Sequence, residues 1–103
     1  MLRMAIGATD MYGLAQLADI RSKEGHVDQA AVFYGAAVEV DGSFESRAKL
    51  VISLSALGRC DDAIEEYTET EDILKECSCG GAAERSAVRA AASAVGRCSA
   101  SHT

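Results

Sequence analysis

The sequence predicts an all-α chain, an α-solenoid in which about five helices form antiparallel hairpins. Its 103 residues include no proline, and much of the 49% apolar fraction is Ala, while only 5% of the residues are aromatic. Ala, Leu and Glu are strong helix formers. A motif of Gly, two residues, Asp, one residue and Ala begins at Gly25 and again at Gly58. This spacing of about 33 residues is typical of stacked helical hairpins.

A second kind of sequence repeat lies near the end of the chain. The segment Ala94–Cys98 repeats the segment Ala56–Cys60 almost letter for letter. The two copies are about 38 residues apart, close to the first spacing. Gly96 is therefore predicted to mark a third turn.

The first two helices are predicted on either side of Gly25. Residues 1–9 are expected to be a flexible lead-in to a helical domain that spans residues 10–98. The first helix ends before Gly25, because glycine adopts the positive φ of a helix terminus without a Cβ clash. Its apolar stripe consists of Leu14, Leu17, Ala18 and Ile20. The second helix runs from about Asp28 to Val40.

The third and fourth helices are predicted on either side of Gly58. The third runs from about Glu45 to Leu57, and its inward side chains are expected to be Ala48, Leu50, Val51, Leu54 and Leu57. The fourth begins at Asp61, a good N-cap residue, and runs to Glu76. Its apolar stripe passes through Ala63, Ile64 and Tyr67.

A fifth helix is predicted from Ala83 to Val95, after a loop that contains two adjacent glycines. It has only two large branched apolar residues, Val88 and Val95. We therefore expect it to be the least stable helix and a candidate for self-association. Residues 99–103 are expected to be a flexible tail.

The charge of the chain disfavours two classes of partner. Its formal charge is −6 and its pI about 4.8, so it should repel nucleic acids and anionic membranes. The acidic side chains of the fourth helix are interpreted as a solvated outer face, with an acidic docking surface as the alternative. We find no signal peptide and no stretch long enough to span a membrane, which predicts a cytoplasmic, reducing location.

The four cysteines are predicted to be reduced structural thiols. Cys60 and Cys77 lie at opposite ends of the fourth helix, about 25 Å apart, so one zinc ion cannot bind all four thiolates. Cys60 and Cys98 lie at equivalent turns of adjacent hairpins, which predicts too long a separation for a disulfide. A redox or partial metal role for Cys77 and Cys79 stays open.

No catalytic motif is found in the sequence. His26 is expected in a turn and His102 in the tail, where neither has a partner to orient it. There is no nucleophile with a base, no phosphate-binding loop and no paired acid motif. We therefore predict no enzymatic activity, no cofactor and no metal site.

These residues together resemble the tetratricopeptide repeat, over residues 11 to about 98. In the first repeat the resemblance rests on Leu14, Leu17, Ala18, Gly25, Ala30, Tyr34 and Ala37; in the second it rests on Leu50, Leu54, Gly58, Ala63 and Tyr67. The fifth helix would open a third repeat. The chain departs from the family at Leu14 and Arg47 (usually Trp), at Val51 and Thr70 (usually small) and in lacking Pro between repeats.

The resemblance implies a binding protein without catalysis, whose first helices line a concave groove for a protein or peptide. The helical phase opposite the buried stripe then predicts the residues that line this groove: Tyr12, Ala15, Asp19, Ser22, Lys23, Glu45, Ala48, Lys49, Ile52 and Ser55. Relatives that clamp the acidic tails of heat-shock chaperones use Lys and Asn where this chain has Ala15 and Asp19, so such a partner is not expected.

Two functional hypotheses stay open at this point. The first is an adaptor that binds a partner segment in the groove. The alternative is an assembly subunit, or a fragment of a longer repeat protein, that docks through its terminal helix. RNA binding by related helical repeats is opposed by the acidic charge and the lack of a basic stripe.

Overall fold

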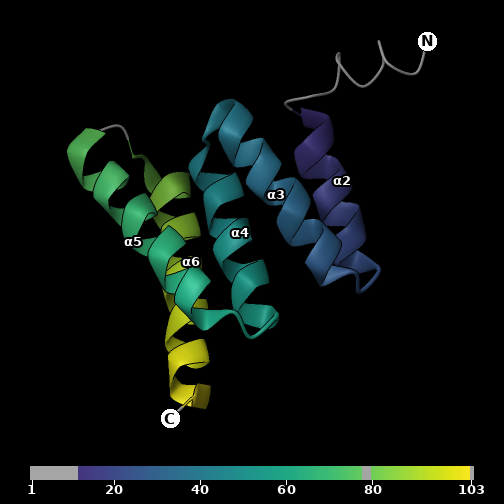
Figure 1. Ribbon diagram of the computed structural model, residues 1–103. Coiled ribbons are helices and arrows are strands. Elements are labelled where there is room, and N and C mark those ends of the chain that lie inside the picture. Colours follow the sequence, from purple (N-terminus) through teal and green to yellow (C-terminus); the bar gives the residue numbers. More distant parts are fainter. Residues whose placement is uncertain (1–11, 78–79, 103) are drawn as a thin grey trace.

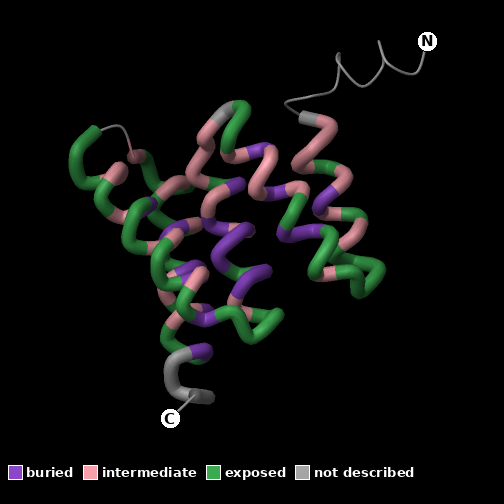
Figure 2. The backbone as a smooth tube through the Cα atoms, in the orientation of Figure 1, coloured by how far each residue is buried: buried purple, intermediate pink, exposed green. Residues whose placement is uncertain are grey.

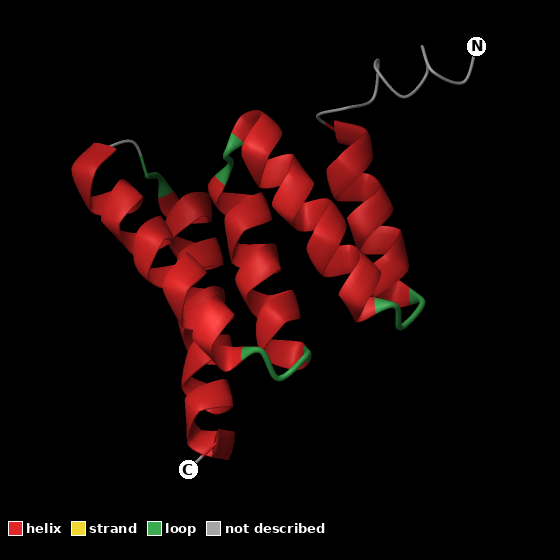
Figure 3. Cartoon of the chain, viewed as in Figure 1, coloured by secondary structure: helices red, strands yellow, loops and turns green. Residues whose placement is uncertain are grey.

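The computed structural model describes residues 12–77 and 80–102, and these residues form five helices and no strand (Figures 1 and 3). The helices are α2 (Tyr12–Lys23), α3 (Val27–Asp41), α4 (Phe44–Ala56), α5 (Cys60–Cys77) and α6 (Ala82–His102). The predicted all-α class is confirmed for this part of the chain. The predicted lead-in, residues 1–9, lies outside the described residues.

Helices that follow one another in the sequence pack side by side, with a reversal of direction at each turn (Figure 1). Helix α6 packs on both α4 and α5. Helix α4 therefore contacts α3, α5 and α6, and it lies at the centre of the packing.

The turns at Gly25 and Gly58 are built in the same way. Both glycines have positive φ, of 91° and 81°. The residue after each glycine donates its N–H to a carbonyl five positions back: His26 to Arg21 at 2.8 Å and Arg59 to Leu54 at 3.0 Å. This pattern is a Schellman motif. The two predicted hairpin turns are confirmed.

The core consists mainly of small residues, and buried positions occur on all five helices (Figure 2). The residues with 0% exposure are Ala18, Ala30, Ala37, Val51, Ala63, Thr70 and Ala91. The Thr70 hydroxyl donates to the Glu66 carbonyl at 2.8 Å, which satisfies its buried polar atom. Small residues allow the helix backbones to approach closely.

Three apolar residues that the sequence placed inward are exposed instead. Ile20, Leu57 and Ile64 have exposures of 50%, 36% and 38%. Leu57 follows the last residue of α4 and belongs to the turn. Ile20 lies two residues after Ala18, and Ile64 directly follows Ala63; both alanines are fully buried. Apolar periodicity alone does not show which of these neighbouring apolar side chains faces the core.

The predicted turn at Gly96 is wrong, because Gly96 lies inside α6. The helix continues to His102, past the predicted end at Val95 and through residues 99–102, which we expected to form a tail. Ala91, Ala94 and Cys98 follow one another at helical spacing and are all buried. Cys98 is therefore buried as part of the continued helix.

Replacing Gly96 with Ala is expected to raise the free energy of unfolding by about 0.5 to 1 kcal/mol, because Ala is the better helix former. A Cβ at Gly96 would meet nothing within 4 Å. Urea denaturation measures the change. The matched control is Gly58→Ala, which should destabilise the fold because φ is +81° there. Destabilisation by both substitutions would place Gly96 in a turn.

Candidate functional site

A groove of about 740 Å³ lies between the first halves of α4 and α6. Its lining is mostly small or apolar. The lining residues are Ser43, Phe44, Glu45, Ala48, Lys49 and Ile52 on the α4 side, and Ala83, Glu84, Ser86, Ala87 and Ala90 on α6. This groove is the candidate binding site.

Helix capping fixes the α4 wall. The Ser43 side chain accepts a hydrogen bond from the Ser46 N–H at 3.1 Å, so α4 begins at Phe44. Phe44, Ala48 and Ile52 then follow at four-residue spacing, which puts them on one face of the helix.

The α6 wall is fixed in a related way. The Glu84 carboxylate accepts a hydrogen bond from the Gly81 N–H at 2.8 Å, just before the helix begins. A carboxylate at this position also favours the positive end of the helix dipole. Ala83, Ala87 and Ala90 follow at helical spacing along the groove. Glu84 is thereby held at the rim.

A charged network joins α2, α3 and α4 beside the groove. Tyr34 on α3 donates its hydroxyl to Asp19 on α2. Lys49 on α4 lies 3.2 Å from the Asp19 carboxylate and 3.2 Å from that of Glu45. Lys49 therefore shares its charge between two carboxylates, one of which lies on another helix.

The pKa values in this network keep its charges in place at neutral pH. Burial raises the pKa of Asp19, but hydrogen bonds from Tyr34 and Lys49 outweigh burial and hold it below its ordinary value of 3.8. Burial lowers the pKa of Lys49, but Asp19 and Glu45 outweigh burial and raise it above 10.5. The contribution of Asp19 to stability is lost as pH falls through its lowered pKa. The contribution of Lys49 to stability is lost as pH rises through the raised pKa of its ammonium group.

Replacing Tyr34 with Phe is expected to raise the pKa of Asp19, because the carboxylate loses a donor that favours its ionised form. Carbon-13 NMR of the carboxyl group during an acid titration measures this pKa. Tyr67→Phe is the matched control, because Tyr67 donates instead to Glu71, at 3.1 Å. If Asp19 titrates identically in the wild type and in Tyr34→Phe, the hydrogen bond does not stabilise the carboxylate.

The structure brings part of the predicted groove together. Glu45, Ala48, Lys49 and Ile52 line the groove, although Ala48 itself is buried. Asp19 does not line it but joins it through Lys49. The predicted residues that lie elsewhere are Ala15, Ser22 and Lys23 on α2, and Ser55 near the end of α4. Tyr12 begins α2, and its side chain is outside the described residues.

Phe44 and the whole α6 wall of the groove were not predicted from the sequence. Ala83, Ala87 and Ala90 line the groove from α6. A signal for them was present, since α6 was already expected to be the first helix of a third repeat. In the tetratricopeptide repeat the first helix of each hairpin lines the groove. The corresponding face of α6 could therefore have been added to the predicted groove residues.

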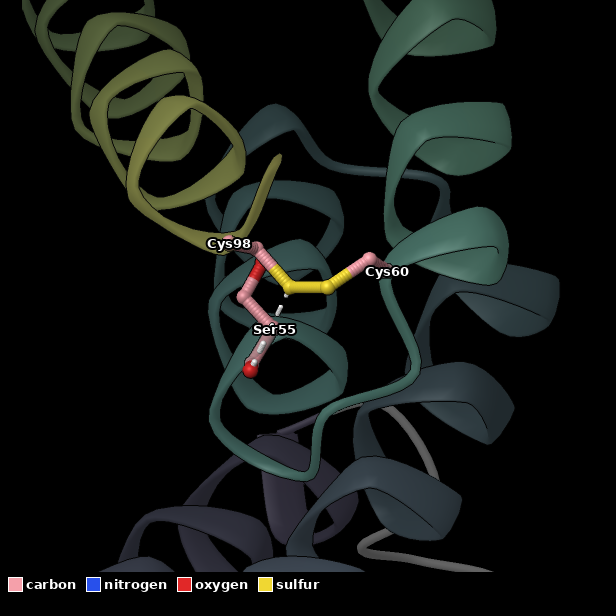
Figure 4. Close-up of a disulfide and its surroundings, with 3 residues drawn as sticks. All are labelled: Ser55, Cys60 and Cys98. Carbon is pink, nitrogen blue, oxygen red and sulfur yellow. Dashed lines mark hydrogen bonds between the residues drawn. A yellow bond between two sulfur atoms is a disulfide. The ribbon is translucent and has the colours of Figure 1, made fainter. Parts of the chain in front are cut away.

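The prediction that Cys60 and Cys98 are too far apart for a bridge is wrong (Figure 4). They form a disulfide with a Cα–Cα distance of 5.8 Å. Because α5 and α6 are antiparallel neighbours, the start of α5 lies beside the later part of α6. The error came from using the spacing of helix axes, whereas Cα atoms on facing sides lie much closer.

Cys77, the last residue of α5, is also disulfide-bonded. The predicted reduced thiols are therefore wrong at Cys60, Cys77 and Cys98. The reducing compartment was predicted together with the reduced thiols, and disulfides at these positions do not support it.

Within residues 12–77 and 80–102, no group of three His, Cys, Asp or Glu side chains is placed to hold a metal ion. In the same part of the chain, no helix combines the length and apolar character needed to cross a bilayer. No protein-family model, curated protein or solved structure matches this chain.

Proposed function

We propose that the chain is a non-enzymatic interaction module of the tetratricopeptide-repeat type, which binds a partner protein segment between α4 and α6. The observation that carries the proposal is the groove itself, which two helices line mostly with small or apolar side chains, together with Glu45, Lys49 and Glu84.

The burial pattern supports the repeat type. Several of the positions that carry the resemblance lie in the core: Ala18, Ala30, Ala37 and Ala63 have no exposed surface, and Tyr34 is buried. The two hairpin turns have the same hydrogen bonds. The α2–α3 and α4–α5 hairpins therefore use one plan, and α6 stands where a third hairpin would begin.

The groove has a size suited to a short segment. Its volume of about 740 Å³ is within the usual range for ligand clefts, about 300 to 1,000 Å³. Its walls extend over residues 44–52 and 83–90, about 12 Å along a helix axis. About two helical turns, or about four extended residues, fit this length.

The charge of the groove favours a basic segment. Glu45 and Glu84 are among the lining residues, and Lys49 is paired with Asp19 and Glu45. The net charge of the chain is also negative, at −6. We infer a partner segment with apolar side chains for the groove and Lys or Arg for the rim.

The outer surface of α6 favours this function over docking through the terminal helix. Arg85, Arg89, Ser93 and Arg97 are exposed on α6, and Arg97 donates to Ser93 at 2.8 Å. A helix that docks to another chain would instead present an apolar stripe.

The test is a selection from a displayed library of random peptides about twelve residues long. Peptides that bind the wild-type chain are counter-selected on Ala90→Trp, which fills the groove from an exposed position. Ala82→Trp is the matched control, because Ala82 is exposed on the same helix and does not line the groove.

The selected peptides are expected to combine Lys or Arg with large apolar residues. Ala90→Trp should weaken their binding by about tenfold or more, and Ala82→Trp by less than about twofold. Amide NMR shifts should centre on Ala48, Ile52 and Ala87. The proposal is wrong if every selected peptide still binds Ala90→Trp as it binds the wild-type chain. It is also wrong if the peptides selected on the wild-type chain are acidic.

A further inference from the structure

The groove depends on a helix with a thin apolar face. Helix α6 buries Val88, Ala91, Ala94 and Cys98. The facing helix α4 buries the larger Leu50, Val51 and Leu54. Because hydrophobic stabilisation scales with buried apolar area, packing alone holds α6 less firmly than it holds α4.

A covalent bond supplements this packing. The Cys60–Cys98 disulfide joins the first residue of α5 to the later part of α6, across a sequence separation of 38 residues. A bond that closes a loop of this length limits the conformations that the chain can adopt when α6 is released from α4 and α5. It should shift the equilibrium toward docked α6 by roughly 30- to 1,000-fold.

The disulfide lies away from the groove, so its effect must pass through the helix. The groove uses α6 residues 83–90. Cys98 is eight residues beyond Ala90, about 12 Å along the axis. Its Sγ lies 3.7 Å from the Ser55 carbonyl oxygen near the end of α4 (Figure 4). The bond therefore joins α6 to α5, and its sulfur contacts the end of α4, without touching a groove occupant.

We propose that oxidation of Cys60 and Cys98 assembles the groove, so that the dithiol chain has a released α6 and the disulfide chain has a complete site. This regulation rests on the proposed function. In the reaction the two thiols lose two protons and two electrons as the Sγ–Sγ bond forms. A small-molecule or protein disulfide accepts them and becomes two thiols.

Burial makes the assembled state persistent. Cys60 and Cys98 are both buried, at 7% and 8% exposure. A reducing thiolate must approach along the disulfide axis, and it reaches this bond only after the end of α6 opens. Oxidation therefore traps α6 in its docked position.

The experiment uses the full chain with Cys77→Ser and Cys79→Ser, in which Cys60–Cys98 is the only possible disulfide. Amide hydrogen exchange is measured after oxidation with glutathione disulfide and again after reduction with dithiothreitol. Reduction should raise the exchange rates of amides 87–97 by about tenfold or more. Amides 49–54 of α4 should change by less than about threefold.

Two results would overturn the inference. Equal protection of amides 87–97 in both redox states would show that packing alone holds α6. An equal loss of protection in α4 and α6 would show that the bond holds the whole fold. If the double serine variant does not fold, the wild-type chain is compared before and after reduction, with Cys60→Ser/Cys98→Ser as the permanently open form.

Peptide binding separates this inference from the proposed function. A library peptide selected on the oxidised chain should bind the reduced chain about tenfold or more weakly. If α6 protection depends on oxidation but no groove-dependent peptide is found, the groove is not a binding site and the function fails. If such a peptide binds both redox states equally, the function stands and the redox inference fails.

Discussion

Replacing Leu54 with Ala is expected to lower the free energy of unfolding by about 2 to 5 kcal/mol. Leu54 lies on α4, the helix that contacts α3, α5 and α6, and its exposure is only 7%. Truncation leaves a cavity at this central position, where well-packed helices on several sides limit collapse. Urea denaturation, with circular dichroism at the helix band, measures the loss.

Ile52→Ala is the control for Leu54→Ala. Ile52 lies two residues earlier on α4 and is 37% exposed, so its truncation should cost less than about 1 kcal/mol. Both variants truncate a large aliphatic side chain of α4 to Ala, so they differ mainly in how far that side chain is buried. Equal losses for the two variants would mean that Leu54 is not in the core.

Replacing Ala63 with Leu is expected to destabilise the fold by about 1 to 3 kcal/mol, because overpacking forces neighbouring side chains and backbone to move. Ala63 has no exposed surface, and its helix α5 packs against α4. The denaturation midpoint should fall. Ala56→Leu, at an exposed position on α4, should leave the midpoint nearly unchanged. An unchanged midpoint for Ala63→Leu would place Ala63 on the surface.

The helices up to Gly58 and the two hairpin turns follow from local chemistry. Gly25 and Gly58 take the positive φ that favours glycine, and each is followed closely by a new helix. Gly96 has almost the same sequence neighbours as Gly58, but it lies inside α6, and the continued helix buries Cys98. Tertiary packing, which local sequence does not contain, therefore decides where α6 ends.

The candidate site was predictable on one side only. Glu45, Lys49 and Ile52 follow from the helical phase of α4. The opposite wall depends on how α6 lies against α4, and the network of Asp19 and Lys49 depends on two helices that are far apart in the sequence. The Cys60–Cys98 pairing likewise depends on the distance between facing helix surfaces.

The most direct measurement of the proposed architecture is disulfide mapping, because the groove exists only if α6 runs back along α5 and α4. Trypsin cleaves after Arg59, Lys75, Arg85 and Arg97, which separates the relevant cysteines into the peptides 60–75, 76–85 and 98–103. The oxidised chain is denatured with free thiols blocked, digested without reduction and analysed by mass spectrometry. We expect peptide 60–75 joined to peptide 98–103. A bond from either of these peptides to 76–85, or blocked thiols at both Cys60 and Cys98, would contradict the placement of α6 and with it the groove.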